Sequence, residues 1–329
     1  MKNMKGIFLS ANLTAIGNVY PDYITERLQQ NVDFVASMDK FTADDFVSRA
    51  DDLRDVEVIF STWGMPHLEL GTIKNYLPSL KAVFYGAGSV QTFAREFIES
   101  DITVVSAWAA NGVPVAEFTV AQIILANKGY YQTLGRKRTQ SSFRGNYNTN
   151  VGIIGAGMIG RLVINMLKNF KFNVYVFDPF LSDESAAELG VTKESLAYIF
   201  ENCDVISNHL ANNAQTVGMI DKKVLDLMKP NAAFINTGRG AQVVEADLIA
   251  ALKAEPERIA LLDVTYPEPP VKDSEFYTLN NVFLSPHIAG SIGAEIERMG
   301  EFMCDEFMSF INGKPLRYAV TMKMLETMA

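Results

Sequence analysis

Short apolar runs rich in β-branched and aromatic residues alternate with segments of helical spacing along this chain. Such alternation is typical of α/β proteins, in which helices connect the parallel strands of a doubly wound sheet. In the first third, the runs predict strands at Ile7–Leu9, Val32–Ala36, Val56–Phe60, Ala82–Tyr85 and Ile102–Val105. The segments between them predict helices at Asp22–Gln30, Ala43–Ala50, Glu69–Tyr76 and Val90–Glu99. These elements make one small parallel-sheet domain.

A second series of apolar runs begins at Asn150 and predicts a second parallel-sheet domain, with strands covered on both faces. Between the series, Pro114 fits the first turn of a long helix that reaches about Asn127, and the polar stretch Gln132–Asn148 indicates a loop. A last helix, about Gly293–Ile311, ends at Asn312-Gly313. The strands predicted for this series are Val151–Ile154, Val174–Phe177, Asp204–Ser207, Ala232–Asn236, Ile259–Asp263 and Val282–Leu284.

Composition and charge narrow the class of protein. With 329 residues, 48% of them apolar and 20% charged, the chain suits about two globular domains and not a disordered protein. Acidic residues outnumber basic ones by 38 to 29, which argues against a nucleic-acid partner because such proteins need a basic face. The basic cluster Arg136-Lys137-Arg138 is short and typical of a solvated face. No run approaches the roughly 18 uninterrupted apolar residues of a membrane span, so no membrane partner is expected.

Cysteine usage and the N-terminal residues suggest a cytoplasmic protein. Cys203 and Cys304 lie far apart in no metal-ligand spacing, so we expect no metal site and two idle thiols in a reducing compartment. The first apolar run, Ile7–Leu9, is much shorter than a secretory core of about 7–15 residues. We also expect no room for a regulatory domain after the last helix.

Gly155, Gly157 and Gly160 form a G-x-G-x-x-G motif between an apolar strand and a helical segment. In dinucleotide-binding domains the first glycine makes the tight turn, the second lets the backbone approach a pyrophosphate, and the third permits close helix–strand packing. Free N–H groups at the helix N-terminus then bind the phosphates. A glycine-rich structural turn is the alternative interpretation.

Asp178 ends the next predicted strand, near the offset of about 20 residues expected for an acid that binds the ribose. Its carboxylate would accept a hydrogen bond from a 2′-hydroxyl and repel a 2′-phosphate. No Arg or Lys occurs from Pro179 to Thr192 to offset that repulsion. The two motifs together therefore predict a Rossmann domain that binds NAD in preference to NADP.

Polar loops follow three of the predicted strands, and the carboxyl ends of parallel strands converge on one crevice. With these loops in place, the chain resembles the D-isomer-specific 2-hydroxyacid dehydrogenase family along nearly its whole length. The ordered motifs that carry the resemblance are Asn111…Val115-Ala116-Glu117, the glycine motif, His209-Leu210, Asn236-Thr237-Gly238-Arg239-Gly240, Asp263…Glu268-Pro269 and Ser285-Pro286-His287.

The resemblance implies an NAD-dependent oxidoreductase that interconverts a D-2-hydroxy acid and its 2-oxo acid, with Arg239, Glu268 and His287 as catalytic residues. A planar guanidinium suits the carboxylate and ketone of a 2-oxo acid. An imidazolium can give a proton to the developing alkoxide, and a neighbouring carboxylate would orient the ring and stabilise its charged form. Taken singly, the three residues have structural interpretations as a turn cap, a loop acid and a core histidine.

The resemblance also implies a set of cofactor-binding residues. His209 is expected to wall the cofactor site mainly through its backbone, although Ala211-Asn212-Asn213 departs from the family pattern that follows it. Asp263 is expected close to the nicotinamide, with a loop cap as the alternative. The full set is Gly155, Gly157, Met158, Ile159, Gly160, Asp178, His209, Leu210, Thr237, Asp263 and Gly290.

For the substrate, the resemblance points to the loop Tyr85–Ser89, which follows the fourth strand and is predicted to open a helix. Backbone N–H groups around Ala87 and Gly88 would hold the substrate carboxylate as helix-terminal donors. Trp63 and Met65 suggest an apolar pocket wall, with core filling as the alternative, and His67 is expected to be structural. No Lys or Arg occurs from Asp55 to Ile73, which favours a small uncharged 2-oxo acid over a phosphoglycerate.

By the same resemblance, residues 1–105 with 291–329 form a flavodoxin-like substrate domain, and residues 106–290 form the Rossmann NAD-binding domain. Crossovers near Ser106–Ala109 and His287–Gly290 would act as hinges, and the Pro114–Asn127 helix would contribute to a homodimer contact. The competing hypothesis is a non-catalytic NAD(H)-sensing interaction protein of corepressor type, because such relatives keep the same three catalytic residues.

Overall fold

The structure, a computed structural model, describes residues 3–134 and 143–326. The chain divides into two compact units, an N-terminal unit of Met1–Asn111 with Ser291–Ala329 and a C-terminal unit of Gly112–Gly290. The boundary before Ser291 coincides with the sequence-based division, whereas the first boundary lies after Asn111 instead of residue 105. The cluster Arg136-Lys137-Arg138 lies outside the described residues.

The N-terminal unit is built on a five-stranded parallel sheet with the order β2-β1-β3-β4-β5, which confirms the predicted strands. All side chains of β3 and β4 are buried, as their mostly apolar sequences predict; the polar exception is Ser61 at the end of β3. The strands are β1 (Met4–Leu9), β2 (Val32–Met38), β3 (Val58–Ser61), β4 (Ala82–Tyr85) and β5 (Thr103–Ser106).

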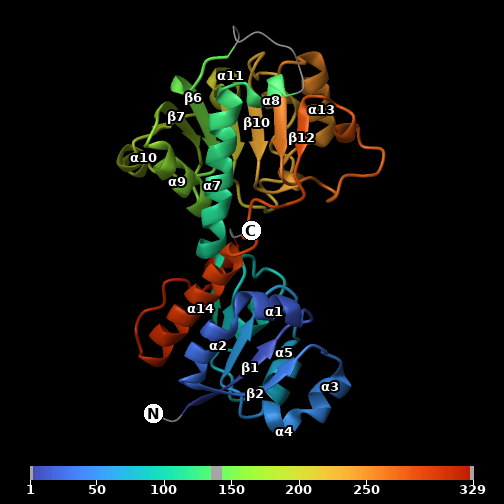
Figure 1. Cartoon of the computed structure of the whole chain (residues 1–329), viewed down its shortest axis with the longest axis vertical. Coiled ribbons are helices and arrows are strands. Elements are labelled where there is room, and N and C mark those ends of the chain that lie inside the picture. The colour runs from blue at the N-terminus through green and yellow to red at the C-terminus, as the bar shows by residue number, and fades with distance from the viewer. Residues whose placement is uncertain (1–2, 135–142, 327–329) are drawn as a thin grey trace. The chain divides into compact units, whose positions relative to one another are not determined.

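Helices pack around this sheet, and one of them comes from the far end of the sequence (Figure 1). The helix Glu295–Ile311 buries Phe307 with its ring 5.4 Å from Phe60 and 5.5 Å from Phe84, between β3 and β4. The helices of the unit are α1 (Leu13–Val19), α2 (Asp22–Gln29), α3 (Ala43–Ser48), α4 (Ala50–Leu53), α5 (Leu70–Tyr76), α6 (Ala94–Glu99), α14 (Glu295–Ile311) and α15 (Met322–Leu325).

Several helical details of the N-terminal unit differ from the sequence-based expectation: the predicted helix Ala43–Ala50 is divided into α3 and α4, and α15 was not predicted. Helix α1 was not predicted; it begins after Asn12, whose side chain accepts a hydrogen bond from the N–H of Ala15. Helix α6 begins at Ala94 instead of Val90, because Val90 and Phe93 are buried in the core and hold the chain in an irregular segment. The residues after β4 therefore do not open a helix.

Helix α7 (Trp108–Asn127) begins in the N-terminal unit and continues into the C-terminal one. Pro114 lies inside this helix, so its predicted place in the first turn was wrong; the residues from Trp108 onward are already helical. By length and apolar composition α7 is the described helix that could cross a membrane. However, 56% of its apolar window is buried, and Ala116 and Ile123 belong to the core of the C-terminal unit.

The C-terminal unit contains a seven-stranded parallel sheet with the order β12-β11-β10-β9-β6-β7-β8. The six predicted strands are present, and the short polar edge strand β8 is an addition. The predicted loop at Gln132–Asn148 is shorter than expected, because Gln132 lies in a helix and β6 already begins at Tyr147. The strands are β6 (Tyr147–Ile154), β7 (Lys171–Phe177), β8 (Thr192–Lys193), β9 (Val205–Asn208), β10 (Ala233–Asn236), β11 (Ile259–Leu262) and β12 (Val282–Leu284).

Helices again cover this sheet, and both faces carry apolar cores (Figure 1). Besides α7, these helices are α8 (Tyr130–Thr133), α9 (Met158–Leu167), α10 (Asp183–Leu189), α11 (Leu196–Asn202), α12 (Lys222–Leu225) and α13 (Glu245–Ala254), with 3₁₀ turns η2 (Gly240–Gln242) and η3 (Glu275–Tyr277).

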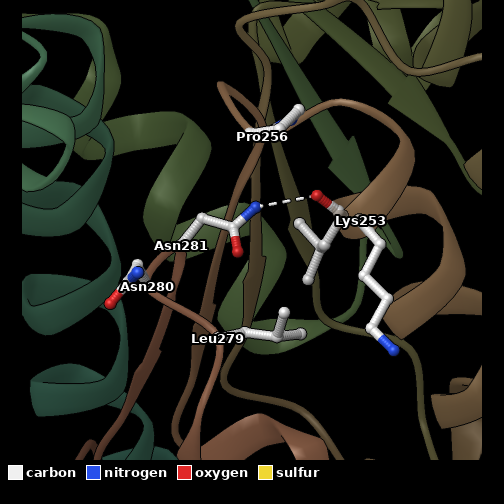
Figure 2. A pocket seen from close by; sticks show the side chains of 6 residues that line it. Lys253, Pro256, Leu279, Asn280 and Asn281 are labelled. Carbon is white, nitrogen blue, oxygen red and sulfur yellow. Dashed lines mark hydrogen bonds between the residues drawn. The ribbon is translucent and has the colours of Figure 1, made fainter.

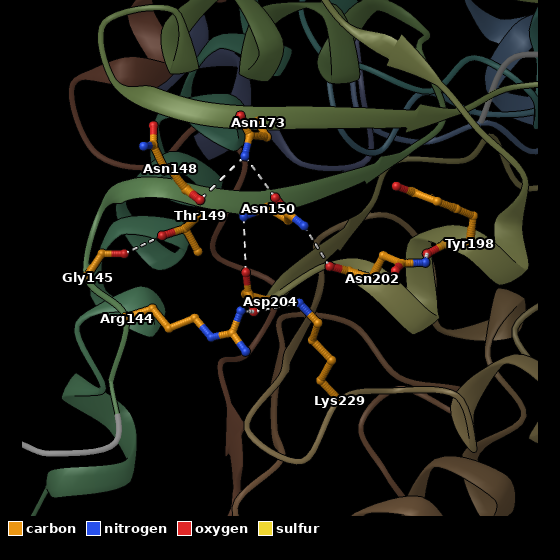
Figure 3. A network of polar contacts seen from close by, with 10 residues as sticks. All are labelled: Arg144, Gly145, Asn148, Thr149, Asn150, Asn173, Tyr198, Asn202, Asp204 and Lys229. Atoms are coloured by element: carbon orange, nitrogen blue, oxygen red, sulfur yellow. Dashed lines mark hydrogen bonds and ion pairs between the residues drawn. The ribbon is translucent and has the colours of Figure 1, made fainter.

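A polar network fixes the amino ends of the two central strands β6 and β9 (Figure 3). The Asp204 carboxylate accepts a hydrogen bond from the N–H of Asn150 at 3.1 Å and forms ion pairs of 2.9 Å with Arg144 and with Lys229. Its side chain is only 11% exposed and that of Lys229 23%, so this pair is less screened than the pair with Arg144, whose side chain is 64% exposed. The network lies where the pairing of β6 with β9 begins, at Val151 and Val205, and at the carboxyl end of the same register Ile154 pairs with Asn208, next to the glycine motif.

Candidate active site

The three glycines of the motif occupy three different environments at the carboxyl end of β6. Gly155 has φ +94°, and a Cβ atom there would lie 2.8–2.9 Å from the backbone of His209 and Leu210. A Cβ on Gly160 would collide with the carbonyl oxygen of Gly155, so only glycine permits this close helix–strand approach. A Cβ on Gly157, in contrast, would meet no protein atom within 4 Å. The turn therefore leaves open space where a ligand phosphate would approach the backbone.

Helix α9 begins directly after Gly157, and its first turn includes Met158 and Ile159. The first hydrogen bond at the N-terminus of this helix is donated by the N–H of Arg161 to the carbonyl of Gly157 at 3.0 Å. The N–H groups of Met158 and Ile159 precede it and have no intrahelical acceptor. These donors and the positive end of the helix dipole suit a pyrophosphate, so the residues fit the group that the motif predicts.

Asp178 follows β7 and joins the glycine turn to its own loop. One carboxylate oxygen accepts from the N–H of Ala156 and the other from the N–H of Phe180, both at 2.7 Å. Each oxygen keeps a further lone pair that can accept from a ribose hydroxyl. The next basic residue along the chain, Lys193, donates to the carbonyl of Leu181 at 2.6 Å, so its Nζ already has a partner.

His209 lies against the glycine turn and is uncharged at neutral pH. Its N–H donates to the carbonyl of Ile154 at 2.7 Å, and its Nε2 lies 2.9 Å from Ser207 Oγ. Burial lowers the pKa of His209 to about 4. Its Nδ1 is buried and has no hydrogen-bond partner in the part of the chain that the structure describes. A neutral ring beside the turn agrees with a wall of the cofactor site and not with proton transfer.

Glu268 and His287 form the pair that the sequence predicted. They follow the adjacent strands β11 and β12, and Glu268 Oε1 lies 2.6 Å from His287 Nδ1. The two side chains are 41% and 47% exposed, respectively, so the pair is accessible to small molecules. His287 has φ +54°, in the left-handed region, so the loop imposes an uncommon conformation on this residue. Among the described residues, none bonds its Nε2, which leaves that atom available for substrate.

Asp263 is the anchor of the loop that carries His287. Its buried carboxylate accepts from Ser285 Oγ at 2.6 Å and from the N–H groups of Ile288 and Ala289, both at 2.9 Å. Asp263 thus makes the contacts of a loop cap, which was the alternative to its expected place close to the nicotinamide. Gly290, the residue after Ala289, ends the C-terminal unit.

Arg239 follows β10 and is brought close to Glu268 by a tight contact between their loops. A Cβ on Gly240 would collide with the backbone of Thr265, so the two loops touch there. Burial lowers the pKa of the Arg239 guanidinium, and the negative charge of Glu268 opposes this shift. Nη1 of Arg239 donates to the carbonyl of Gly238 at 2.8 Å, and the neighbouring Thr237 is buried with its hydroxyl 3.1 Å from that of Thr119.

Three buried amides under these loops were missed by the sequence analysis as functional residues. Asn208, Asn236 and Gln242, which we call the amide triad, are each at most 1% exposed. Asn208 Nδ2 donates to Asn236 Oδ1 at 3.0 Å and to Gln242 Oε1 at 2.6 Å. A polar residue at the end of the buried strand β9 was a signal for Asn208, but no local pattern identified Gln242.

In the N-terminal unit, the loop after β4 presents two backbone N–H groups. Buried Ser106 donates to the carbonyls of Ala87 at 2.9 Å and of Gly88 at 2.6 Å. Because the peptide bonds are planar and trans, the N–H groups of Gly88 and Ser89 point away from Ser106. Neither has a hydrogen-bond partner among the described residues. Two such donors form a small anion-binding nest, although they are not helix-terminal as predicted, because α6 begins later.

Other residues considered for the substrate pocket separate into two groups. Met65 packs against the core of the N-terminal unit, so core filling was the correct interpretation for this residue. Trp63 is 39% exposed on the loop after β3 and is free to contact a ligand. His67 Nδ1 lies 3.0 Å from the carbonyl of Thr92, a structural contact.

The cysteines and the surface pocket lie apart from these loops. Burial raises the pKa of Cys203 to about 12 and that of Cys304 to about 11, so both thiols stay protonated. Within residues 3–134 and 143–326, no three His, Cys, Asp or Glu side chains gather as metal ligands. A pocket of the C-terminal unit contains no candidate site residue (Figure 2); it is lined by Leu252, Lys253, Pro256, Leu279, Asn280 and Asn281.

Comparison with known proteins identifies the family. Residues 120–289 match the NAD binding domain of the D-isomer specific 2-hydroxyacid dehydrogenases. The chain belongs to this family, and the matched segment is its NAD-binding domain. D-3-phosphoglycerate dehydrogenase of Archaeoglobus fulgidus is 32% identical over 231 residues, 68% of this chain and 44% of that protein. The chain spans less than half the length of the curated relatives it resembles.

Solved structures show the same fold over the whole chain. A D-isomer specific 2-hydroxyacid dehydrogenase from Lactobacillus delbrueckii ssp. bulgaricus, in its NAD complexed form, has a TM-score of 0.77 at 20% identity and covers 97% of this chain and 100% of its own. A 2-hydroxyacid dehydrogenase from Ketogulonicigenium vulgare Y25 has a TM-score of 0.74 at 23% identity, with coverage of 98% and 99%. Both parallel-sheet units are therefore shared by these structures.

Proposed function

We propose that this protein is an NAD-dependent oxidoreductase that reduces a small 2-oxo acid to its D-2-hydroxy acid and catalyses the reverse oxidation. The Glu268–His287 pair supports this most directly, because a carboxylate 2.6 Å from Nδ1 leaves the other ring nitrogen for proton transfer. The pair lies on the NAD-binding domain, in the loops after β11 and β12, and β11 is the neighbour of β10, the strand that precedes Arg239.

The cofactor site is formed by the glycine turn and the elements around it. The N–H groups at the start of α9 would hold the pyrophosphate, and Asp178 would accept from the ribose. Met158, Ile159, Leu210, Thr237, Asp263 and Gly290 would complete the walls of this site. NADH, when bound, supplies the hydride for the carbonyl carbon of the substrate.

The substrate is held and protonated by the catalytic residues. Arg239 binds the carboxylate and the ketone oxygen of the 2-oxo acid through its planar set of donors. As the carbonyl carbon gains a hydride, its oxygen gains negative charge, and Nε2 of the His287 imidazolium gives it a proton. Glu268 keeps the ring oriented through Nδ1 and stabilises the imidazolium before the transfer. In the oxidation, neutral His287 takes the proton back.

Two observations support the proposed substrate class: the backbone N–H groups that can bind an anion, and the lack of Lys or Arg in the sequence from Asp55 to Ile73. The N–H groups of Gly88 and Ser89 suit a carboxylate, and Ala87 and Trp63 are the further substrate-contacting residues that we propose on the same N-terminal unit. The sequence from Asp55 to Ile73 has no cation for a phosphate, although several relatives are D-3-phosphoglycerate dehydrogenases. We therefore propose a small 2-oxo acid with an uncharged side chain.

Turnover assays test this function. Purified protein is given NADH and a panel of 2-oxo acids, with D-3-phosphoglycerate and NAD⁺ as the reverse assay. We expect NADH oxidation with uncharged 2-oxo acids and release of the D-hydroxy acid only. Tight NADH binding with no turnover of any substrate would favour the cofactor-sensing alternative of corepressor type.

We also propose that the chain forms a homodimer through the C-terminal unit. The last part of α7 and the elements after it expose the apolar side chains Leu125, Tyr130, Leu134 and Tyr147. Buried amide atoms of Gln122, Asn127 and Gln132 in the same region have no hydrogen-bond partner within residues 3–134 and 143–326. Sedimentation velocity distinguishes a monomer from a homodimer. A monomer at all protein concentrations would contradict the proposal.

A further inference from the structure

The amide triad holds two short segments that belong to different parts of the proposed site. Leu210 N–H donates to Asn208 Oδ1 at 3.3 Å, and Leu210 carbonyl accepts from Gln242 Nε2 at 2.8 Å. Arg239 N–H donates to Gln242 Oε1 at 3.3 Å, and Arg239 carbonyl accepts from Asn236 Nδ2 at 3.1 Å. Both backbone polar groups of each residue are therefore bound by the same three side chains.

Gln242 is the member that joins the two segments directly. Its Nε2 binds Leu210, while its Oε1 binds Arg239 and also accepts from Asn208. Because Gln242 is fully buried, loss of its side chain would leave these backbone groups without their protein partner. A rotation of this amide in response to one segment would therefore disturb the other.

The Leu210 segment in turn contacts the glycine motif. The backbone of His209 and Leu210 lies against Gly155. A Cβ atom built on Gly155 would lie only 2.8–2.9 Å from their backbone atoms. The path from the backbone of Arg239 to the first glycine thus consists of one amide side chain and one peptide. Buried polar networks that are fully satisfied are rigid and transmit small displacements.

We propose that Gln242 is a positioning residue that couples the cofactor wall at Leu210 to the backbone of Arg239. This inference rests on the proposed function. Cofactor contact with the wall fixes Leu210, and through Gln242 it fixes the segment from which the substrate-binding guanidinium extends. By linkage, a substrate held by Arg239 stabilises the cofactor-bound wall to the same degree.

The first experiment compares NADH affinity in Gln242→Met and in a matched control. Methionine keeps the length of the side chain and removes its hydrogen bonds. Asn281 is the control because its buried amide donates to the carbonyls of Leu252 and Arg258 at 3.0 and 2.9 Å, at the pocket apart from the site (Figure 2). We expect Gln242→Met to raise the NADH Kd about tenfold and Asn281→Leu to change it less than about twofold at a similar loss of Tm. Equal Kd values for the two variants would overturn the proposal.

Hydrogen exchange tests the coupling itself, without any substrate. NADH should slow amide exchange in both segments, around Leu210 and around Arg239, in the unaltered protein. In Gln242→Met, NADH should slow exchange around Leu210 only. Equal protection of the Arg239 segment in both proteins would show that Gln242 transmits nothing.

A conservative variant keeps the test informative if Gln242→Met folds poorly. Gln242→Glu retains an acceptor for Arg239 and Asn208, and in its ionised form, which is favoured when NADH is titrated at alkaline pH, it has no donor for Leu210. We expect its basal exchange around Arg239 to equal that of the unaltered protein, with the NADH Kd raised as in Gln242→Met. A normal NADH Kd in Gln242→Glu would contradict the proposal.

Kinetics separate this inference from the proposed function. With a 2-oxo acid that the unaltered protein reduces, Gln242→Met at saturating NADH should raise KM about tenfold and change kcat less. An unaltered protein that reduces no 2-oxo acid would refute the proposed function, whereas the NADH affinity and exchange data would still decide the role of Gln242.

Discussion

The N–H of His287 donates to the carbonyl of Asp263 at 3.0 Å. The carboxylate of Asp263 holds the N–H groups of the next two residues, Ile288 and Ala289, so that three consecutive amides point to one aspartate. This arrangement keeps His287 at φ +54° and fixes the direction in which its ring leaves the backbone. The histidine is thus preorganised by its backbone on one side and by Glu268 on the other.

The Glu268–His287 pair should act as one unit in kinetics. His287→Asn removes the proton donor and should lower kcat for reduction by about 10²–10⁴-fold. Glu268→Gln should cause a smaller loss alone and almost no further loss in the His287→Asn background, because its contribution passes through the ring. A double-mutant cycle on kcat/KM measures this, and fully additive losses would contradict the pairing.

Arg239→Lys should not be a conservative change. Lysine keeps the positive charge but has no planar set of donors for a carboxylate and a ketone. We expect kcat/KM to fall by about 10²-fold or more, or about 2.7 kcal/mol of transition-state binding, with NADH affinity preserved. Steady-state kinetics and NADH titration check both parts. Activity close to that of the unaltered protein would remove Arg239 from the mechanism.

Asp178 should control the choice between NADH and NADPH. Asp178→Asn keeps an acceptor for backbone N–H groups and removes the charge that repels a 2′-phosphate, whereas Asp178→Ala removes both. We expect NADH to be preferred by the unaltered protein and the preference to narrow in both variants, with a larger loss of NADH affinity in Asp178→Ala. Equal kcat/KM for the two cofactors in the unaltered protein would refute this assignment.

Substitutions of two glycines of the motif should affect different properties: one should lower NADH affinity and the other should lower thermal stability. Gly157→Ala places a methyl group where no protein atom lies within 4 Å, so Tm should stay the same while NADH affinity falls. Gly155→Ala is strained by its φ of +94° and by the backbone of His209, so its Tm should fall. Thermal unfolding with and without NADH measures both. An unchanged NADH Kd in Gly157→Ala would place the pyrophosphate elsewhere.

His209 should make the protein less stable at acidic pH. Burial lowers its pKa from 6.5 to about 4, so the unfolded state binds a proton between these values that the folded state does not. Stability should therefore be full above pH 6.5 and fall toward pH 4, by up to about 3 kcal/mol at 1.36 kcal/mol per pKa unit. NMR titration of the three histidines assigns the pKa, with His209→Gln as the control. Titration of His209 near 6.5 would contradict this expectation.

The strands were predictable from sequence because most are apolar and buried on both faces. The two-residue strand β8 was missed, since Thr192 and Lys193 are polar and exposed at the sheet edge. The place of Pro114 inside α7 also escaped prediction, because its missing N–H and fixed φ favour a first turn without excluding an interior position.

Those parts of the candidate site were predictable in which a short sequence motif contains the functional residues. Glycine spacing and Asp178 indicated the cofactor turn, and family resemblance indicated the Glu268–His287 pair. The amide triad was not predictable, because its members come from three separate segments and are recognisable as a unit only from the hydrogen bonds between them. Likewise, the nest at Gly88 depends on Ser106, which lies 18 positions away in sequence.

The N-terminal unit is discontinuous, and this has a consequence for biosynthesis. Helix α14 supplies Met299, Met303, Cys304 and Phe307 to the same core as β3 and β4. Until residues 295–311 leave the ribosome, the core that this helix shares with α1 and α2 is incomplete, and the aromatic side chains Phe60 and Phe84 lack their contacts with Phe307. The C-terminal unit, which is continuous, can complete its core earlier. The part of the chain that is translated first is therefore expected to be the last to fold, and to depend on chaperones during that interval.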